Sequence, residues 1–225
     1  MIHKRIFVIL TLLILFSACK QKSESFSSQG QGMITYDIRY PDSNRFAAKQ
    51  ILFPKKMILV FKGNKAAFIV TAGMGMVQLV NLMDGSNRKY TSLLIDNLRE
   101  NIGCKLTPEE IEANENAEHF EFETVNGTRQ ISGIECRKAI GKNGKNGNKT
   151  EVYYDPAIEF NYFNSPFKSI GHLMLEYTHT INNLTLQLSA VNVDLKTPVD
   201  SGLFEIKGKY RWVNQKEFFD YLNTF

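Results

Sequence analysis

The sequence lacks an apolar run long enough to form a transmembrane helix. Only fourteen uncharged residues separate Arg5 from Lys20, whereas a helix needs about 20 apolar residues to span the hydrocarbon core of a bilayer. Local patterns of catalysis are also missing, since the chain has no G-x-S-x-G, no H-E-x-x-H and no glycine-rich phosphate loop. We therefore expect neither a transmembrane anchor nor an enzyme, and we expect no cofactor.

Histidine is scarce, with four in the chain. His172 and His179 are seven residues apart in an expected strand, so their side chains face opposite sides and do not share a metal. The M-x-M spacing of Met74 and Met76 could hold Cu(I). Two thioethers without a neighbouring Cys or His make a poor site, and the flanking glycines favour a pliable apolar surface or a lid instead. No metal site is predicted.

Cysteine occurs three times, and the first cysteine ends an N-terminal signal pattern. Two basic residues precede the apolar residues 6–16 and the small pair Ser17 and Ala18, which is the order of a secretory signal peptide. Cys19 follows directly, and the stretch FSAC resembles a bacterial lipobox, whose cysteine receives diacylglycerol before cleavage. The pattern predicts a signal peptide at 1–18 and a lipid-modified Cys19, whose several acyl chains hold the protein to a membrane.

The remaining cysteines, Cys104 and Cys136, form an even pair in a chain that is expected to be exported. An oxidising compartment allows a disulfide between them. Two buried free thiols are an equal alternative, because sequence separation does not set the Cα distance that a bridge needs. Neither cysteine stands in a local signature of a catalytic thiol.

An excess of basic charge is missing from the mature chain. Removal of residues 1–18 leaves 25 basic against 23 acidic side chains. The densest basic run, KNGKNGNK at 142–149, has no aromatic residue and is typical of a turn. Nucleic-acid binding usually requires a concentrated basic face, so we expect no nucleic-acid partner.

The mature chain divides into a tether and one domain. Residues 19–32 contain Cys19 followed by small polar residues, which predicts a flexible tether. From Met33 onward, apolar and polar residues alternate as in strands with one solvated face. We therefore predict a single β-rich domain at 33–225.

Turn dipeptides separate the expected strands and predict five hairpins. Asn and Gly in such pairs tolerate the positive φ that tight antiparallel hairpins require. The result is a mainly β fold, a curved antiparallel meander or half-barrel. The five turns are Gly63-Asn64, Asp84-Gly85, Asn126-Gly127, the loop around 142–148 and Asn182-Asn183.

The last long strand and two helices complete the expected fold. The apolar face of residues 184–195 changes phase near Ala190, which predicts a β-bulge and a bent sheet. The stretch TPEE predicts a short helix near 107–117 that docks weakly, because few of its residues are apolar. A C-terminal helix is expected with one apolar face, formed by Phe218, Phe219, Leu222 and Phe225, and with Asn214 and Glu217 as a cap pair.

Several short motifs occur in a characteristic order: FKGN at 61–64, TAGMGM at 71–76, a strand with Cys136, VYYD at 152–155 and PVDSGLFEI at 198–206. In this order they resemble a family of uncharacterised lipoproteins from Bacteroidota, over most of residues 33–213. The resemblance implies a domain of unknown function whose fold is similar to the lipoprotein-localisation factors. Such a fold is a half-barrel around a hydrophobic groove, with helices as a lid. It implies no catalytic residue.

The sequence favours a non-catalytic binding module that is tethered to a membrane. The concave side of the sheet is expected to bind a lipid or an acylated polypeptide. The alternative is a closed core, with the outer surface acting as a scaffold or as a subunit that binds an envelope protein. The default location is the outer membrane, facing the periplasm. By strand phase, the lining residues would be Phe68, Val70, Met74 and Met76, with Leu184, Leu186 and Leu188 opposite.

Overall fold

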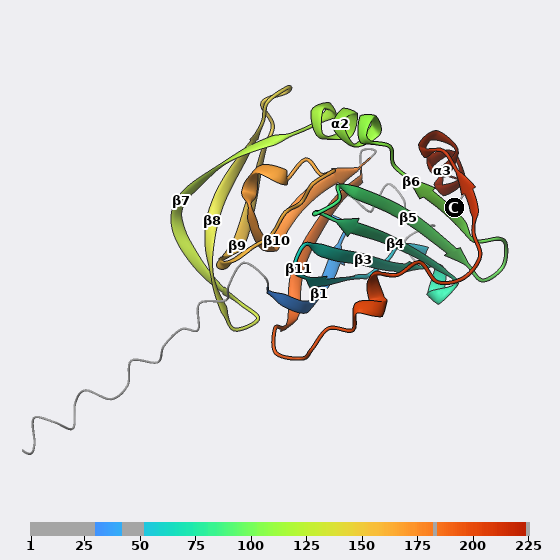
Figure 1. The fold of residues 1–225 in the computed structure, drawn as a ribbon. Coiled ribbons are helices and arrows are strands. Elements are labelled where there is room, and N and C mark those ends of the chain that lie inside the picture. The colour runs from blue at the N-terminus through green and yellow to red at the C-terminus, as the bar shows by residue number, and fades with distance from the viewer. Residues whose placement is uncertain (1–29, 42–51, 182–183, 224–225) are drawn as a thin grey trace, which may run out of the picture.

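The structure is a computed structural model that describes residues 30–41, 52–181 and 184–223. The predicted signal peptide, Cys19 and most of the predicted tether lie outside the described residues. Twelve strands form one curved sheet that does not close (Figure 1), which confirms the predicted mainly β fold. Among the described residues, no helix has the length and apolar character needed to cross a membrane.

The strands follow the chain closely in their spatial order. They are β1 (Gln31–Arg39), β2 (Lys56–Lys62), β3 (Lys65–Ala72), β4 (Val77–Asp84), β5 (Lys89–Asp96), β6 (Ile102–Lys105), β7 (Phe120–Ile131), β8 (Ile134–Asn143), β9 (Lys149–Glu159), β10 (His172–Ile181), β11 (Leu184–Asp194) and β12 (Arg211–Val213).

Two antiparallel meanders make up the sheet. One meander runs from β1 to β6 and the other from β7 to β11, and the pairing of β1 with β11 joins them. The short strand β12 lies parallel to β6 at one edge of the sheet, and β7 forms the other edge. The meander prediction is therefore correct for each half, while the central pairing brings together residues as far apart as Met33 and Asp194.

The predicted turn at Asn126-Gly127 is wrong. These two residues lie inside β7, where the register with β8 shifts between Val125 and Thr128. The pair therefore makes a bulge in a continuous strand. The chain reverses instead at Ser132-Gly133, where both residues have positive φ, 48° and 83°. The other expected hairpins join strands that pair antiparallel, although Asn182-Asn183 itself lies outside the described residues.

The predicted bulge near Ala190 is confirmed. Thr35 pairs with Asn192, and the next residue, Tyr36, pairs with Ala190, so Val191 is the extra residue. The extra residue moves the apolar face of β11 from one phase to the other, as the sequence pattern requires.

Helix α2 (Pro108–Ala117) connects strands near opposite ends of the sheet. Only residues 106–119 join β6 to β7, and a ten-residue helix is about 15 Å long. Because so short a connection joins distant strands, the sheet must curve strongly (Figure 1). The expected capping box is present, since Thr107 Oγ1 accepts from the Glu110 amide at 3.2 Å and Glu110 Oε2 accepts from the Thr107 amide at 2.8 Å.

This helix docks through few side chains, as its apolar pattern predicts, and Ile111 is the one residue within α2 that is buried. Its Ile111 side chain is 1% exposed, and its Glu115 carboxylate binds Asn164 and Lys168 in the β9–β10 connection and Arg88 at the β4–β5 turn. A single ion-pairing residue therefore supplies docking that the apolar pattern does not reveal.

Helix α3 (Gln215–Leu222) packs against β6 beside the C-terminus of the described chain. Asn214 Oδ1 accepts from the Glu217 amide at 2.9 Å, as the cap prediction requires. Phe218 is buried, whereas Phe219 is 53% exposed, so the prediction that both belong to one buried face is wrong for Phe219. Phe225 lies outside the described residues.

An aromatic segment packs into the main core on the concave side of the sheet. The connection between β9 and β10 folds inward, and we call residues 160–171 the aromatic plug. Its rings pack on the strands around it, with Phe160 against Phe61 at 5.7 Å and Phe167 against Tyr177 at 5.6 Å between ring centroids. The plug contributes five buried apolar side chains to the main core: Phe160, Tyr162, Phe163, Phe167 and Ile170.

Candidate functional site

A row of apolar side chains crosses three strands beyond the aromatic plug. Val70 of β3 lies opposite Leu79 of β4, and Leu79 lies opposite Leu94 of β5. Ala72 and Val77 form the next pair toward the ends of β3 and β4. Because directly paired residues in a sheet project from the same face, this row makes one continuous apolar wall.

This wall bounds a pocket of about 320 Å³. Segment 52–54 and Leu222 of α3 form the opposite side, and Gly73 stands at the β3–β4 turn. None of the described lining residues has a charged or hydrogen-bonding side chain, so the pocket offers apolar contacts only. The full lining is Leu52, Phe53, Pro54, Val70, Ala72, Gly73, Val77, Leu79, Leu94 and Leu222.

The predicted lining residues separate into four groups, of which Leu184 alone is the last. Val70 lines the pocket. Phe68 packs beside the aromatic plug, with its ring centroid 6.3 Å from that of Phe160, and Leu186 and Leu188 belong to the same core. Met74 and Met76 are 78% and 41% exposed at the β3–β4 turn. The structure therefore does not bring these residues together in one groove, because the chain's own aromatic rings occupy the middle of the concave face.

Leu184 lies apart from this pocket. It pairs with Ile181 at the hairpin end of β10 and β11, and it is partly buried. The residues that sequence reasoning missed are Leu52, Phe53, Pro54, Ala72, Gly73, Val77, Leu79, Leu94 and Leu222. The alternation in VQLVNLM would have identified Leu79 once the register of β3 and β4 was known, whereas Leu222 depends on how α3 docks.

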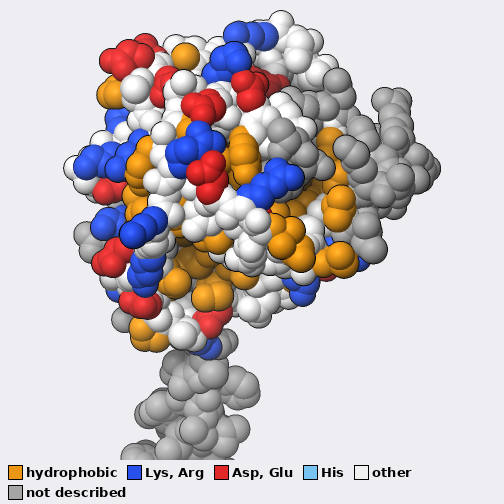
Figure 2. Space-filling model, turned by 90° about the vertical axis from the view of Figure 1, so that its right-hand side faces the viewer, with side chains coloured by type: hydrophobic (Ala, Val, Ile, Leu, Met, Phe, Trp, Pro, Cys, Tyr) orange, Lys and Arg blue, Asp and Glu red, His pale blue; other side chains and the backbone are white. Residues whose placement is uncertain are grey.

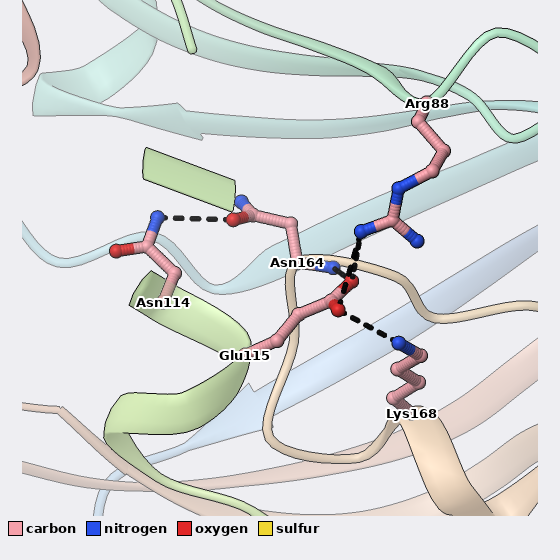
Figure 3. A network of polar contacts seen from close by, with 5 residues as sticks. All are labelled: Arg88, Asn114, Glu115, Asn164 and Lys168. Atoms are coloured by element: carbon pink, nitrogen blue, oxygen red, sulfur yellow. Dashed lines mark hydrogen bonds and ion pairs between the residues drawn. The ribbon is translucent and has the colours of Figure 1, made fainter. Parts of the chain in front are cut away.

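A polar network centred on Glu115 holds α2 in place (Figure 3). Lys168 Nζ lies 2.7 Å and Arg88 Nη2 lies 3.3 Å from its carboxylate, and the Asn164 amide donates to Oε1 at 3.1 Å. Asn114 Nδ2 donates to the Asn164 side chain at 2.9 Å. The network thus ties α2 to the β4–β5 turn and to the aromatic plug.

The network also fixes the ionisation of Glu115. Burial by itself would raise the pKa of this carboxyl, but the hydrogen bonds from Lys168, the Asn164 amide and Arg88 outweigh burial and hold the pKa below its ordinary value. Glu115 is therefore a structural anion, because its oxygens are already bound by these donors.

Cys104 and Cys136 are buried free thiols and form no bridge. Cys104 packs in the cluster with Phe218, whereas Cys136 belongs to the main core. Burial, reinforced by the carboxylates of Asp155 and Glu176, raises the pKa of the Cys136 thiol to about 12. Burial likewise raises the pKa of Cys104. Since the thiolate is the reactive form, neither thiol is activated as a nucleophile.

His179 is a partly buried histidine on β10. Burial lowers the pKa of His179 to about 4, so its imidazole is neutral, and its ring packs edge-on against Phe167 at 5.1 Å. Within the described part of the chain, no three His, Cys, Asp or Glu side chains converge as they would around a metal ion.

Comparison with known proteins shows likeness at the level of fold. No family model matches the chain, and no curated protein matches it. The protein PNGF-II, solved in space groups C2 and P21, superposes on 85% of the chain with TM-scores of 0.51 and 0.54, at 18% and 16% sequence identity. The chain covers 32% and 33% of the two solved chains, so it spans about a third of their length. The resemblance to Bacteroidota lipoproteins stays a prediction.

Proposed function

We propose that this protein is a non-catalytic module of the bacterial cell envelope that binds a hydrophobic ligand, a single acyl chain of a lipid or of an acylated polypeptide. The observation that carries this proposal is the apolar pocket formed by Val70, Leu79 and Leu94 together with Leu222. A ligand with an ionised group inside this pocket would lose its hydration without gaining a partner. An acyl chain has no such group along its length.

The size of the pocket supports one chain as the ligand. Its volume of about 320 Å³ stands at the lower end of the range of roughly 300–1,000 Å³ typical of ligand pockets. Each buried methylene contributes about 0.8 kcal/mol, so eight methylenes supply roughly 6 kcal/mol before the costs of association. A whole diacyl lipid would not fit unless part of it remained outside.

The membrane anchor is a separate part of the proposal. We propose that Cys19 carries the lipid and that the protein resides at the outer membrane, facing the periplasm. The signal pattern and the polar tether support this location. Substitution Cys19→Ser should abolish fatty-acid labelling and membrane fractionation, and unchanged labelling would refute the anchor.

A second candidate function is a scaffold or subunit with a closed core that binds an envelope protein. The aromatic plug favours it, because Phe160, Phe163 and Phe167 are buried in the main core of the sheet. On this alternative, the small pocket beside α3 is a packing defect and the outer surface carries the activity.

Substitution Ala72→Trp separates the two candidates. Ala72 lines the pocket and is partly exposed, so an indole there can enter the pocket without displacing the main core. Thr71→Trp is the matched control, because Thr71 is the exposed neighbour on the other face of β3. We expect Ala72→Trp to weaken binding of dansyl-labelled undecanoic acid at least roughly ten-fold, with no effect of Thr71→Trp.

The same titration tests the proposal against the scaffold. Wild-type protein should bind the dansyl probe saturably, and lipid extracted from purified protein should contain an acyl species in a fixed ratio. Absence of saturable binding by a folded wild-type protein would rule out the acyl-chain function and favour the scaffold.

A further inference from the structure

Three apolar side chains project into solvent beside the pocket. Met74 and Leu98 are 78% and 70% exposed, more than any other large apolar side chain among the described residues. Met76 lies close to Leu98, because the Asn97 amide donates to the Met76 carbonyl at 3.1 Å. These three residues stand at the β3–β4 and β5–β6 turns, and we call Met74, Met76 and Leu98 the apolar tip.

The backbone around Met74 adopts a conformation that costs free energy. Gly73, Met74 and Gly75 all have positive φ, 57°, 56° and 92°. The left-handed region costs a residue with a side chain about 1–2 kcal/mol. Strain of this kind persists where the surrounding structure requires it, and it often accompanies function. Here it directs an apolar side chain outward, the opposite of what folding alone favours.

The apolar tip borders the mouth of the pocket. Gly73 and Val77, which flank Met74 and Met76, both line the pocket. Figure 2 faces this side of the molecule, the side on which α3 lies, and hydrophobic side chains are exposed there in groups between charged ones. The apolar tip therefore adjoins the lining of the pocket at Gly73 and Val77.

We infer that the apolar tip inserts into the surface of a lipid bilayer, so that an acyl chain passes between the membrane and the pocket without crossing water. This inference rests on the proposed acyl-chain function. Exposure to water costs an acyl chain about 0.8 kcal/mol for each methylene, and contact between the mouth and the bilayer removes this cost. A few aliphatic side chains on separate turns suit a fluid lipid surface, which adapts to them without a complementary groove.

The predicted anchor allows this contact. The tether enters the domain at Gln31, which pairs with Lys62 at the far end of β2, whereas the apolar tip follows Ala72 at the opposite end of β3. A strand of seven or eight residues is about 25 Å long. The twelve steps from Cys19 to Gln31 reach up to about 40 Å when extended. The domain can therefore turn its apolar tip toward the leaflet that holds Cys19.

A fluorescence experiment on the full-length lipidated protein tests the insertion. Met74→Trp places a reporter in the apolar tip. Lys89→Trp places a reporter at the exposed start of β5, which is the end of that strand away from the apolar tip. The native Trp212, the single tryptophan of the chain, gives the same background in both variants. In phosphatidylcholine vesicles with brominated acyl chains, we expect a blue shift and quenching for Met74→Trp beyond that of Lys89→Trp. Equal quenching would overturn the inference and leave a protein as the partner of the tip.

A double substitution separates membrane contact from pocket binding. Met74→Ser with Leu98→Ser should slow transfer of dansyl-labelled undecanoic acid from vesicles roughly ten-fold, while affinity for the same probe in solution stays unchanged. Loss of affinity in solution would make these residues part of the pocket and overturn the docking role. If wild-type protein fails to bind the probe while Met74→Trp is still quenched, the proposed function fails and membrane docking stands.

Discussion

Gln215, the first residue of α3, donates a hydrogen bond of 3.2 Å to Oδ1 of Asn114 in α2, across 101 residues of sequence. Asn114 in turn donates to Asn164 in the aromatic plug. One run of polar side chains therefore connects the plug, α2 and α3, and α3 supplies Leu222 to the pocket. The position of the pocket's outer wall thus depends on contacts that lie outside the pocket.

Removal of this link should loosen α3. We expect Gln215→Ala to lower the free energy of unfolding by about 1 kcal/mol, the usual contribution of one hydrogen bond, and to weaken binding of the dansyl probe by displacing Leu222. Urea denaturation and probe titration measure the two effects. Lys216→Ala, on the exposed side of the same turn, should change neither, and an equal effect of both variants would refute the role of the link.

Stability should depend on the ionisation of Glu115. Its pKa is lowered in the folded protein, so its contribution is complete above the ordinary value of 4.5 and is lost as the pH falls below that value. We expect Glu115→Gln to be less stable than wild type at neutral pH, with the difference shrinking in acid. Thermal melts between pH 3 and 7 measure this, with Glu112→Gln, exposed on the same helix, as the control. A difference that does not change with pH would contradict the assignment.

The packing of Trp212 should require glycine at position 103. A Cβ at Gly103 would stand 2.6 Å from Cζ3 of the indole, which must then move away from β6. We expect Gly103→Ala to cost about 1–3 kcal/mol of stability and to shift the emission of the single tryptophan toward that of a solvated indole. A Cβ at Gly133 would have no atom within 4 Å, so Gly133→Ala is a control that adds a methyl group without a close contact. The φ of +83° at this position adds backbone strain to the control. Unchanged emission in Gly103→Ala would contradict the packing.

Thiol reactivity tests the cysteines and the anchor together. Cys104 and Cys136 are buried, and burial raises the pKa of both thiols, so neither should react with a disulfide reagent in the folded protein. If Cys19 carries lipid, native protein shows no reactive thiol and denatured protein shows two. Three reactive thiols in the denatured protein would mean that Cys19 is unmodified. No reactive thiol in the denatured protein would mean that Cys104 and Cys136 form a disulfide.

Local patterns predicted the strands well, because alternation and turn chemistry act over a few residues. The phase change around Val191 identified a bulge correctly, and Thr107 identified the start of α2. Asn126-Gly127 was misread because positive φ at Gly127 serves a bulge as well as a turn. Distinguishing the two requires knowledge of the partner strand.

The candidate site was less predictable, because it depends on contacts between distant segments. Phe68 and Val70 share one face of β3, yet Phe68 packs beside Phe160 while Val70 lines the pocket. No periodicity in residues 160–171 indicates that this connection folds into the concave face. Strand phase therefore predicts which side a residue faces, but not what covers it.

The pairing of Met33 with Asp194 has a consequence for biogenesis. Each half of the sheet can form from neighbouring hairpins. The pairing of β1 with β11, however, joins segments that are far apart in the sequence, so it forms only when both segments are available. Such distant pairings slow folding. β1 therefore keeps one unpaired edge until β11 is available, and over that interval the partly folded polypeptide is prone to aggregation.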